Sequence, residues 1–248
     1  ADILERESGL RDVLAISCGI DASRFINKTP TSNAEPRVLF VGRLDYEKRL
    51  DILIRAIHQI SAEIDVNLEI VGNGGERETL RKLSADLGIE DRVKFLGFVS
   101  EADLPKAYER ATVFAMPSIA ELQSIATMEA MASGRPVIAA IAMALPHLVH
   151  SGDNGYLYEP EDVSELANRL REVLTADKQE LERLSENSLH LIQAHDITNT
   201  LNIFENLYQG IGEFAPTTED NLEGYLEPIG RLSDSLRERV VSFRESAS

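Results

Sequence analysis

Cysteine and long apolar runs are scarce in this sequence. Among its 248 residues there is one cysteine, Cys18, which excludes an internal disulfide framework and suits a reducing compartment. No apolar stretch approaches the roughly 20 residues that a membrane-spanning helix needs, and no apolar run precedes a cleavage site near the N-terminus. We therefore expect a soluble, cytoplasmic protein.

Positive charge is also scarce. The chain has 25 Lys and Arg residues against 42 Asp and Glu residues, a formal net charge of −17, which argues against non-specific binding to nucleic acid or to an anionic membrane. The His, Cys and Asp residues show no metal-ligand spacing, so we expect no metal. The G-x-G-x-x-G fingerprint of dinucleotide enzymes is absent as well, because Arg77 stands where "VGNGG" would need its last glycine.

Hydrophobic residues make up 43% of the chain, which is enough for a sizeable core. Over residues 37–173, short apolar runs alternate with helical patterns. This alternation predicts an α/β fold with six or seven strands in a doubly wound, mostly parallel, Rossmann-like sheet. In such a sheet, ligands bind at the carboxyl ends of the strands, where the strand order reverses.

Composition divides the chain into four parts. Residues 1–20 combine the end of a helix with an expected strand at 12–20. Residues 21–36 are rich in Ser, Thr, Asn and Pro, and we expect them to form a linker. Residues 37–210 are the predicted Rossmann-like domain, and residues 211–248 are a tail with one polar helix.

Cations and glycines follow the first two expected strands of this domain. Gly42 and Arg43 end the first strand, Lys48 is expected in the first turn of the next helix, and Gly72 ends the second strand. A helix that starts near Ser124 would direct its N–H groups and positive dipole end at the same edge of the sheet. Together these groups would hold a pyrophosphate and stabilise it as a leaving group.

Glu121 and Glu129 stand eight residues apart, on either side of this helix start. Glu129 is placed to accept two vicinal hydroxyls, as on a ribose, and Glu121 to accept hydroxyls at the other end of the diphosphate. Each charged residue alone is more often a solvated surface charge. The set, at the carboxyl ends of successive strands, indicates a site that brackets a pyrophosphate between two polyols.

Three stretches carry a resemblance to a known family: "FVGRLDYEKRLDILIRAI", "LEIVGNGGERETLRKLSADLGIEDRVKFLGFV" and "PSIAELQSIATMEAMASGRPVIAA". Over roughly residues 10–210 the chain resembles the C-terminal, donor-binding half of glycosyltransferase family 4, whose members have two Rossmann-like domains (the GT-B architecture). "GIDASRF" looks like the family's interdomain segment. The resemblance implies retaining transfer of a hexosyl unit from a nucleotide-sugar to an acceptor hydroxyl, with no metal or other cofactor.

The resemblance also implies roles for individual residues. Arg43 and Lys48 match the phosphate-binding pair and, with Glu121 on the donor sugar, form the expected catalytic set. Glu129 matches the residue that binds the ribose. The backbone of Gly97, Phe98 and Val99 matches the loop that recognises the base, and Gly42, Gly72 and Ile125 are expected to line the nucleotide site.

Two departures from the family pattern change what is expected. Leu122, Gln123 and Ser124 replace the usual Gly-Phe-Gly, so we expect altered donor-sugar contacts, with Ser124 still capping the helix and binding phosphate. The N-terminal acceptor domain, which would also carry any membrane contact, is represented by residues 1–20 alone. We therefore expect a fragment that is inactive by itself and that associates with the missing domain or with a second copy through residues 1–20.

Two other functions stay open on the sequence. A sugar-nucleotide epimerase with the GT-B architecture would bind the same ligand, but it needs further acid and base residues beside Glu121. A non-catalytic nucleotide-sugar-binding module would need none, because half of an active cleft is enough to bind a ligand.

Overall fold

A computed structural model describes residues 16–25 and 35–209 of the chain. The chain divides into two compact units, one of residues 22–192 and one that joins residues 1–21 to residues 193–248. The sequence-based boundaries differ from this division, since they place residues 193–210 in the Rossmann-like domain. Among the described residues, no helix is long and apolar enough to cross a bilayer.

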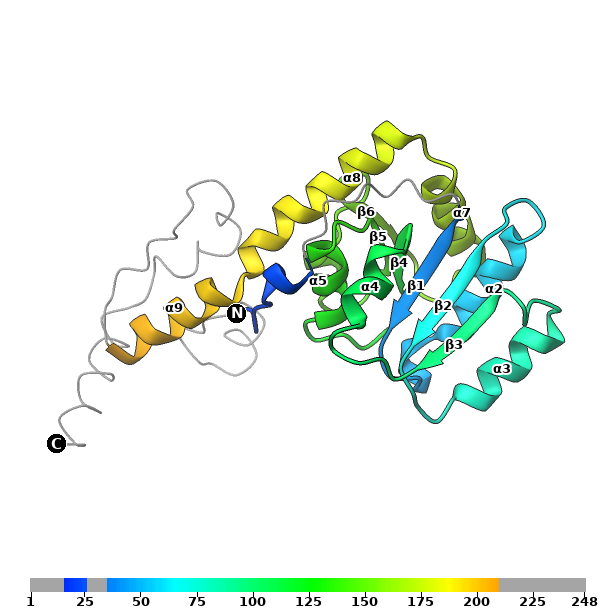
Figure 1. The fold of residues 1–248 in the computed structure, drawn as a ribbon, viewed down its shortest axis with the longest axis horizontal. Coiled ribbons are helices and arrows are strands. Elements are labelled where there is room, and N and C mark those ends of the chain that lie inside the picture. Colours follow the sequence, from blue (N-terminus) through cyan, green and yellow to red (C-terminus); the bar gives the residue numbers. More distant parts are fainter. Residues whose placement is uncertain (1–15, 26–34, 210–248) are drawn as a thin grey trace. The chain divides into compact units, whose positions relative to one another are not determined.

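The unit of residues 22–192 is built on one six-stranded sheet (Figure 1). Its strands are β1 (Arg37–Val41), β2 (Asn67–Val71), β3 (Val93–Gly97), β4 (Val113–Met116), β5 (Val137–Ala140) and β6 (Gly155–Tyr158). They lie in the order β3-β2-β1-β4-β5-β6, and every neighbouring pair is parallel. The predicted doubly wound, parallel α/β fold is thereby confirmed.

Helices connect the strands and cover both faces of the sheet (Figure 1). Contacts join α2 to α3 and α7, and α5 to α8. The chain runs outward from β1 to β3 and then returns to β4, so right-handed connections place α2 and α5 on opposite faces. The helical segments of this unit are η1 (Ala22–Arg24), η2 (Tyr46–Lys48), α2 (Leu50–Ile60), α3 (Arg77–Asp86), α4 (Leu104–Glu109), α5 (Ile125–Ala132), α6 (Leu145–Leu148), α7 (Val163–Leu174) and α8 (Lys178–Leu191).

The return from β3 to β4 fixes where a ligand site can form. β1 and β4 are neighbours in the sheet, yet the chain leaves them in opposite directions along the strand order. The segments that follow these two strands therefore start side by side at the carboxyl ends, which is where ligands bind in sheets of this kind. Both strands are anchored in the core, since Phe40 and Phe114 are fully buried.

Glycines bring the loops after β1 and β2 into contact. Gly72 has φ 127°, and a Cβ atom there would lie 1.9 Å from the carbonyl oxygen of Gly42. At Gly74 a Cβ atom would lie 2.4 Å from the carbonyl oxygen of Leu44. The N–H of Leu44 also donates to the carbonyl of Asn73 at 3.0 Å. The "VGNGG" glycines thus allow the second loop to support the first.

The other unit is described over residues 16–21 and 193–209. Its helix α9 (Ile197–Gln209) follows the short helix η3 (Ile192–His195), and Ile20 pairs with Asp196 in an isolated parallel bridge. The strand expected at 12–20 is wrong over residues 16–19, which form no regular structure, and its residues 12–15 lie outside the described part. Gly19 gives the physical reason, because its φ of 72° turns the backbone out of an extended conformation.

Candidate functional site

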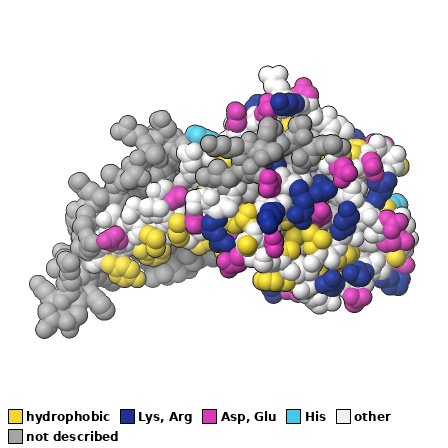
Figure 2. All heavy atoms as spheres, viewed as in Figure 1, with side chains coloured by type: hydrophobic (Ala, Val, Ile, Leu, Met, Phe, Trp, Pro, Cys, Tyr) yellow, Lys and Arg dark blue, Asp and Glu magenta, His cyan; other side chains and the backbone are white. Residues whose placement is uncertain are grey.

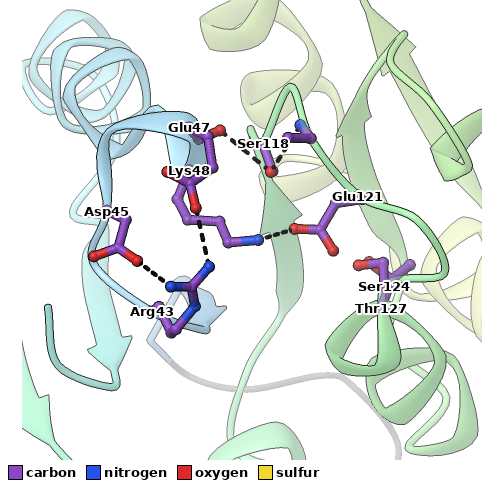
Figure 3. A network of polar contacts seen from close by, with 9 residues as sticks. Arg43, Asp45, Glu47, Lys48, Ser118, Glu121, Ser124 and Thr127 are labelled. Carbon is purple, nitrogen blue, oxygen red and sulfur yellow. Dashed lines mark hydrogen bonds and ion pairs between the residues drawn. The ribbon is translucent and has the colours of Figure 1, made fainter.

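Backbone contacts hold together the loops that follow β1 and β4. The carbonyl of Glu47 accepts the N–H of Ile119 at 3.0 Å and the hydroxyl of Ser118 at 3.2 Å. The same hydroxyl accepts the N–H of Ala120 at 3.3 Å. Figure 3 shows the result, with Lys48 from one loop facing Glu121 from the other.

Lys48 and Glu121 form an ion pair across this junction, with side chains that are 13% and 10% exposed. The carbonyl of Glu121 also accepts the N–H of Ala144 at 3.0 Å, which ties its loop to the segment after β5. Lys48 was predicted in the first turn of a helix, and this is wrong. It ends the 3-10 turn η2, because Arg49 adopts a left-handed conformation (φ 48°) and separates that turn from α2.

Arg43 lies beside this pair and is largely exposed. Its guanidinium contacts Asp45 at 2.5 Å and Glu47 at 3.1 Å. The junction therefore holds two cations, Arg43 and Lys48, and three carboxylates, counting Glu121. A phosphate that binds here must compete with Asp45 and Glu47 for Arg43. The sequence reasoning did not consider these two carboxylates, although both stand between Arg43 and Lys48 in "GRLDYEK".

The start of α5 presents backbone donors at the same junction. No described residue accepts a hydrogen bond from the N–H of Ile125 or Ala126, so both groups remain open to an anion. Ser124 occupies the N-cap position with φ 48°. The expected cap by its side chain is wrong, however, because its hydroxyl instead shares a 2.8 Å hydrogen bond with Thr127.

Glu129 lies one turn further along α5 and is half-buried. The buried hydroxyl of Tyr108 donates to its Oε2 atom at 2.7 Å. Burial raises the pKa of the Glu129 carboxyl, while the Tyr108 hydrogen bond and the charge of Arg24 act in the opposite direction. No hydrogen bond between described residues joins Glu129 to Lys48 or Arg43. The sequence carried no signal for Tyr108, which looks like an ordinary buried helix residue.

The remaining predicted site residues lie at or after the carboxyl ends of β3 and β4. Gly97 ends β3 and its carbonyl accepts the N–H of Gly72 at 2.8 Å. Val99 is half-buried and Gln123 exposed. Phe98 (82%), Leu122 (81%) and Ile125 (54%) are exposed apolar side chains, and Figure 2 shows hydrophobic side chains exposed among charged ones on the viewed face. In the described ranges, no group of three or more His, Cys, Asp or Glu residues could hold a metal ion.

Comparison with known proteins identifies this arrangement of elements. Residues 21–190 match the family model described as glycosyl transferases group 1. The chain is 34% identical over 183 residues to the D-inositol 3-phosphate glycosyltransferase of Mycolicibacterium smegmatis, a match that covers 71% of this chain and 41% of that protein.

Two solved structures extend the similarity to the fold. The sucrose-phosphate synthase of Thermosynechococcus elongatus aligns with a TM-score of 0.75 and 29% identity, covering 84% of this chain and 55% of that one. HepE of Anabaena, solved in complex with UDP, aligns with a TM-score of 0.70 and 30% identity, covering 78% of this chain and 57% of that one. The chain thus spans 41% to 57% of the length of these three proteins.

Proposed function

The chain belongs to the glycosyl transferases group 1 family, and on that premise we propose that it binds the nucleotide-sugar donor of a retaining hexosyltransferase. The observation that carries the proposal is the junction of Lys48 and Glu121, between the carboxyl ends of β1 and β4 and beside the open N–H groups of α5. Cationic side chains and a helix N-terminus at such a point suit a diphosphate.

In the proposed transfer, the bond between the donor's anomeric carbon and the diphosphate oxygen breaks. The acceptor hydroxyl forms the new bond to that carbon and passes its proton to the leaving diphosphate. The diphosphate leaves with both bonding electrons and gains negative charge. Lys48, Arg43 and the N–H groups of Ile125 and Ala126 would stabilise that charge. Glu121, next to Lys48, would accept hydroxyls of the sugar at the end of the diphosphate.

Glu129 would bind the ribose hydroxyls, and the backbone of Gly97, Phe98 and Val99 would contact the base. Leu122 is exposed and stands where the family usually has glycine. This supports contacts with the donor sugar that differ from those of the family's usual Gly-Phe-Gly. We propose that no metal takes part, because cations and helix N–H groups of the chain itself face the diphosphate.

Calorimetric titration of the purified chain tests this proposal. UDP, GDP, ADP and their hexose derivatives are compared, each with and without EDTA. We expect one nucleoside diphosphate to bind with an affinity that EDTA does not change. Loss of binding in EDTA would contradict metal-free binding, and no binding of any nucleotide would contradict the function itself.

Transfer is a separate part of the proposal. The chain spans about half of its relatives, and the other half of a cleft would be needed to orient an acceptor and exclude water. We therefore propose that the chain alone transfers no sugar even with a donor bound. Labelled nucleotide-sugars and a panel of sugar and lipid acceptors test this, and turnover on the order of 1 per second would contradict it.

A further inference from the structure

Tyr108 is a buried polar side chain that the proposed chemistry does not yet use. Its ring lies on α4 and is fully buried. The ring of Phe25 packs edge-on against it, with centroids 5.8 Å apart and planes at 85°, and the ring of Phe114 lies at 5.8 Å and 45°. Because aromatic rings pack against it on two sides, the phenol has little freedom to turn, and the position of its hydroxyl is fixed.

That hydroxyl has two acceptors in reach, both on α5. The distance to Glu129 Oε2 is 2.7 Å and the distance to the carbonyl oxygen of Ala126 is 3.2 Å. A phenol can donate only one hydrogen bond. The contact with the carboxylate is shorter and charge-assisted, so the Tyr108 hydroxyl donates to Glu129. Within the described residues, no hydrogen bond engages Oε1, the other carboxylate oxygen of Glu129.

We propose that Tyr108 is a positioning residue that holds Glu129 ready for the vicinal hydroxyls of a ribose, an inference that rests on the proposed function. With Oε2 engaged by the phenol, the carboxylate keeps one orientation and offers Oε1 to the ligand. A carboxylate fixed before binding loses less side-chain freedom when the nucleoside arrives. The phenol also compensates a half-buried charge that would otherwise be poorly solvated.

The Tyr108→Phe variant of the full chain tests this, because it removes the hydroxyl and keeps the ring packing. Calorimetry measures three ligands: the nucleoside diphosphate, its 2′,3′-dideoxy analogue and inorganic pyrophosphate. We expect affinity for the ribonucleotide to fall about 5- to 10-fold, the worth of one hydrogen bond. Affinity for the dideoxy analogue and for pyrophosphate should not change, since neither ligand has the hydroxyls that Glu129 would bind.

Tyr158→Phe is the matched control. Tyr158 is also buried, on β6, and its hydroxyl has no hydrogen-bond partner among the described residues. Its removal should change none of the three affinities. Thermal unfolding of both variants separates loss of binding from loss of fold.

The outcomes separate the inference from the function on which it rests. Equal losses for the ribonucleotide and the dideoxy analogue would mean that Tyr108 only supports the fold, and would overturn the inference alone. Failure of the unmodified chain to bind any nucleotide would overturn both. Should Tyr108→Phe unfold, Glu129→Gln tests the ribose contact on which the inference depends: it must spare the dideoxy analogue and weaken the ribonucleotide, and equal effects on the two would overturn the inference.

Discussion

Two buried carboxylates of this protein, Glu69 and Glu121, are both paired with cations but stand in opposite regions of the sheet. Glu69 lies in the middle of β2 and contacts the guanidinium groups of Arg110 at 2.7 Å and Arg37 at 3.5 Å. Its partners lie near the amino ends of strands, since Arg37 begins β1 and Arg110 comes shortly before β4. Glu121 lies in the loop after β4, at the carboxyl edge of the sheet, and its partner is Lys48.

The two pairs differ in what surrounds them. Arginine presents a planar fork that suits a permanent, directional pair, whereas lysine is a point charge that can exchange one anion for another. Glu69 is enclosed by regular strands, while Lys48 and Glu121 sit beside N–H groups that no described residue uses. Burial and pairing alone therefore do not mark a site. We propose that a position at the carboxyl edge, with open N–H donors nearby, distinguishes an ion pair at a binding site from a structural one.

The largest effect is expected from Glu69→Ala. Removal of the carboxylate leaves Arg110, whose side chain is 36% exposed, and the more buried Arg37 without this partner. The free energy of unfolding should therefore fall by roughly 2–3 kcal/mol, less than for a fully buried pair. Urea unfolding measures this, and Asp65→Ala, which breaks an exposed pair with Arg92, should cost less than about 1 kcal/mol. Nucleotide affinity should be unchanged at temperatures where the variant is folded. Weaker binding by the folded variant would show that the two regions are not independent.

Lys48→Ala is the corresponding change at the site. It should weaken binding of a nucleoside diphosphate by roughly 1.5–3 kcal/mol, the worth of a charge-assisted hydrogen bond. Lys82→Ala, on the exposed face of α3, is the control and should leave the affinity unchanged. Calorimetry compares the two variants, and equal affinities would put the phosphate elsewhere.

The contrast between the two regions also explains how much could be predicted from the sequence. Strands and helices followed from periodicity and from glycine and proline positions, so the sheet and the edge that carries Glu121 were predictable. Which side chains face each other across two loops depends on the strand order, which brings β1 beside β4. The pairing of Lys48 with Glu121 needed the structure for that reason.

Local conformation was the second limit. Arg49 and Ser124 both take left-handed φ values, although neither is a glycine, and no residue pattern signals this. The first displaces Lys48 from α2 into a separate turn, and the second turns the Ser124 hydroxyl toward Thr127 instead of the helix backbone. Both errors fell at the proposed site, where tertiary contacts override local preference.

Glu121→Gln tests whether a phosphate can replace Glu121 as the partner of Lys48. The amide keeps the shape of the side chain but removes the charge that competes with phosphate for Lys48. Inorganic pyrophosphate should therefore bind about 5-fold more tightly, or ~1 kcal/mol. A nucleotide-sugar should lose any advantage that it has over the nucleoside diphosphate. Weaker pyrophosphate binding would mean that Glu121 holds Lys48 in place, as Glu69 holds its arginines.

Glu129 lies between the two cases, because it is half-buried and its neighbour is the neutral hydroxyl of Tyr108. Burial raises the pKa of Glu129, so its carboxylate takes up a proton at a higher pH than an ordinary glutamate does. The charged form is the one that binds ribose hydroxyls most strongly. The affinity for a nucleoside diphosphate should therefore be greatest above this raised pKa and fall as the pH is lowered through it. In Glu129→Gln the affinity should not fall in this pH range, because glutamine does not titrate. Pyrophosphate, titrated alongside, corrects for protonation of the phosphates.

At neutral pH, Glu129→Gln should weaken the binding free energy of the nucleotide by about 1 kcal/mol and leave that of pyrophosphate unchanged. If the variant showed the same pH dependence as the unmodified chain, Glu129 would not contact the ligand, and binding would depend on Lys48 and its neighbours alone.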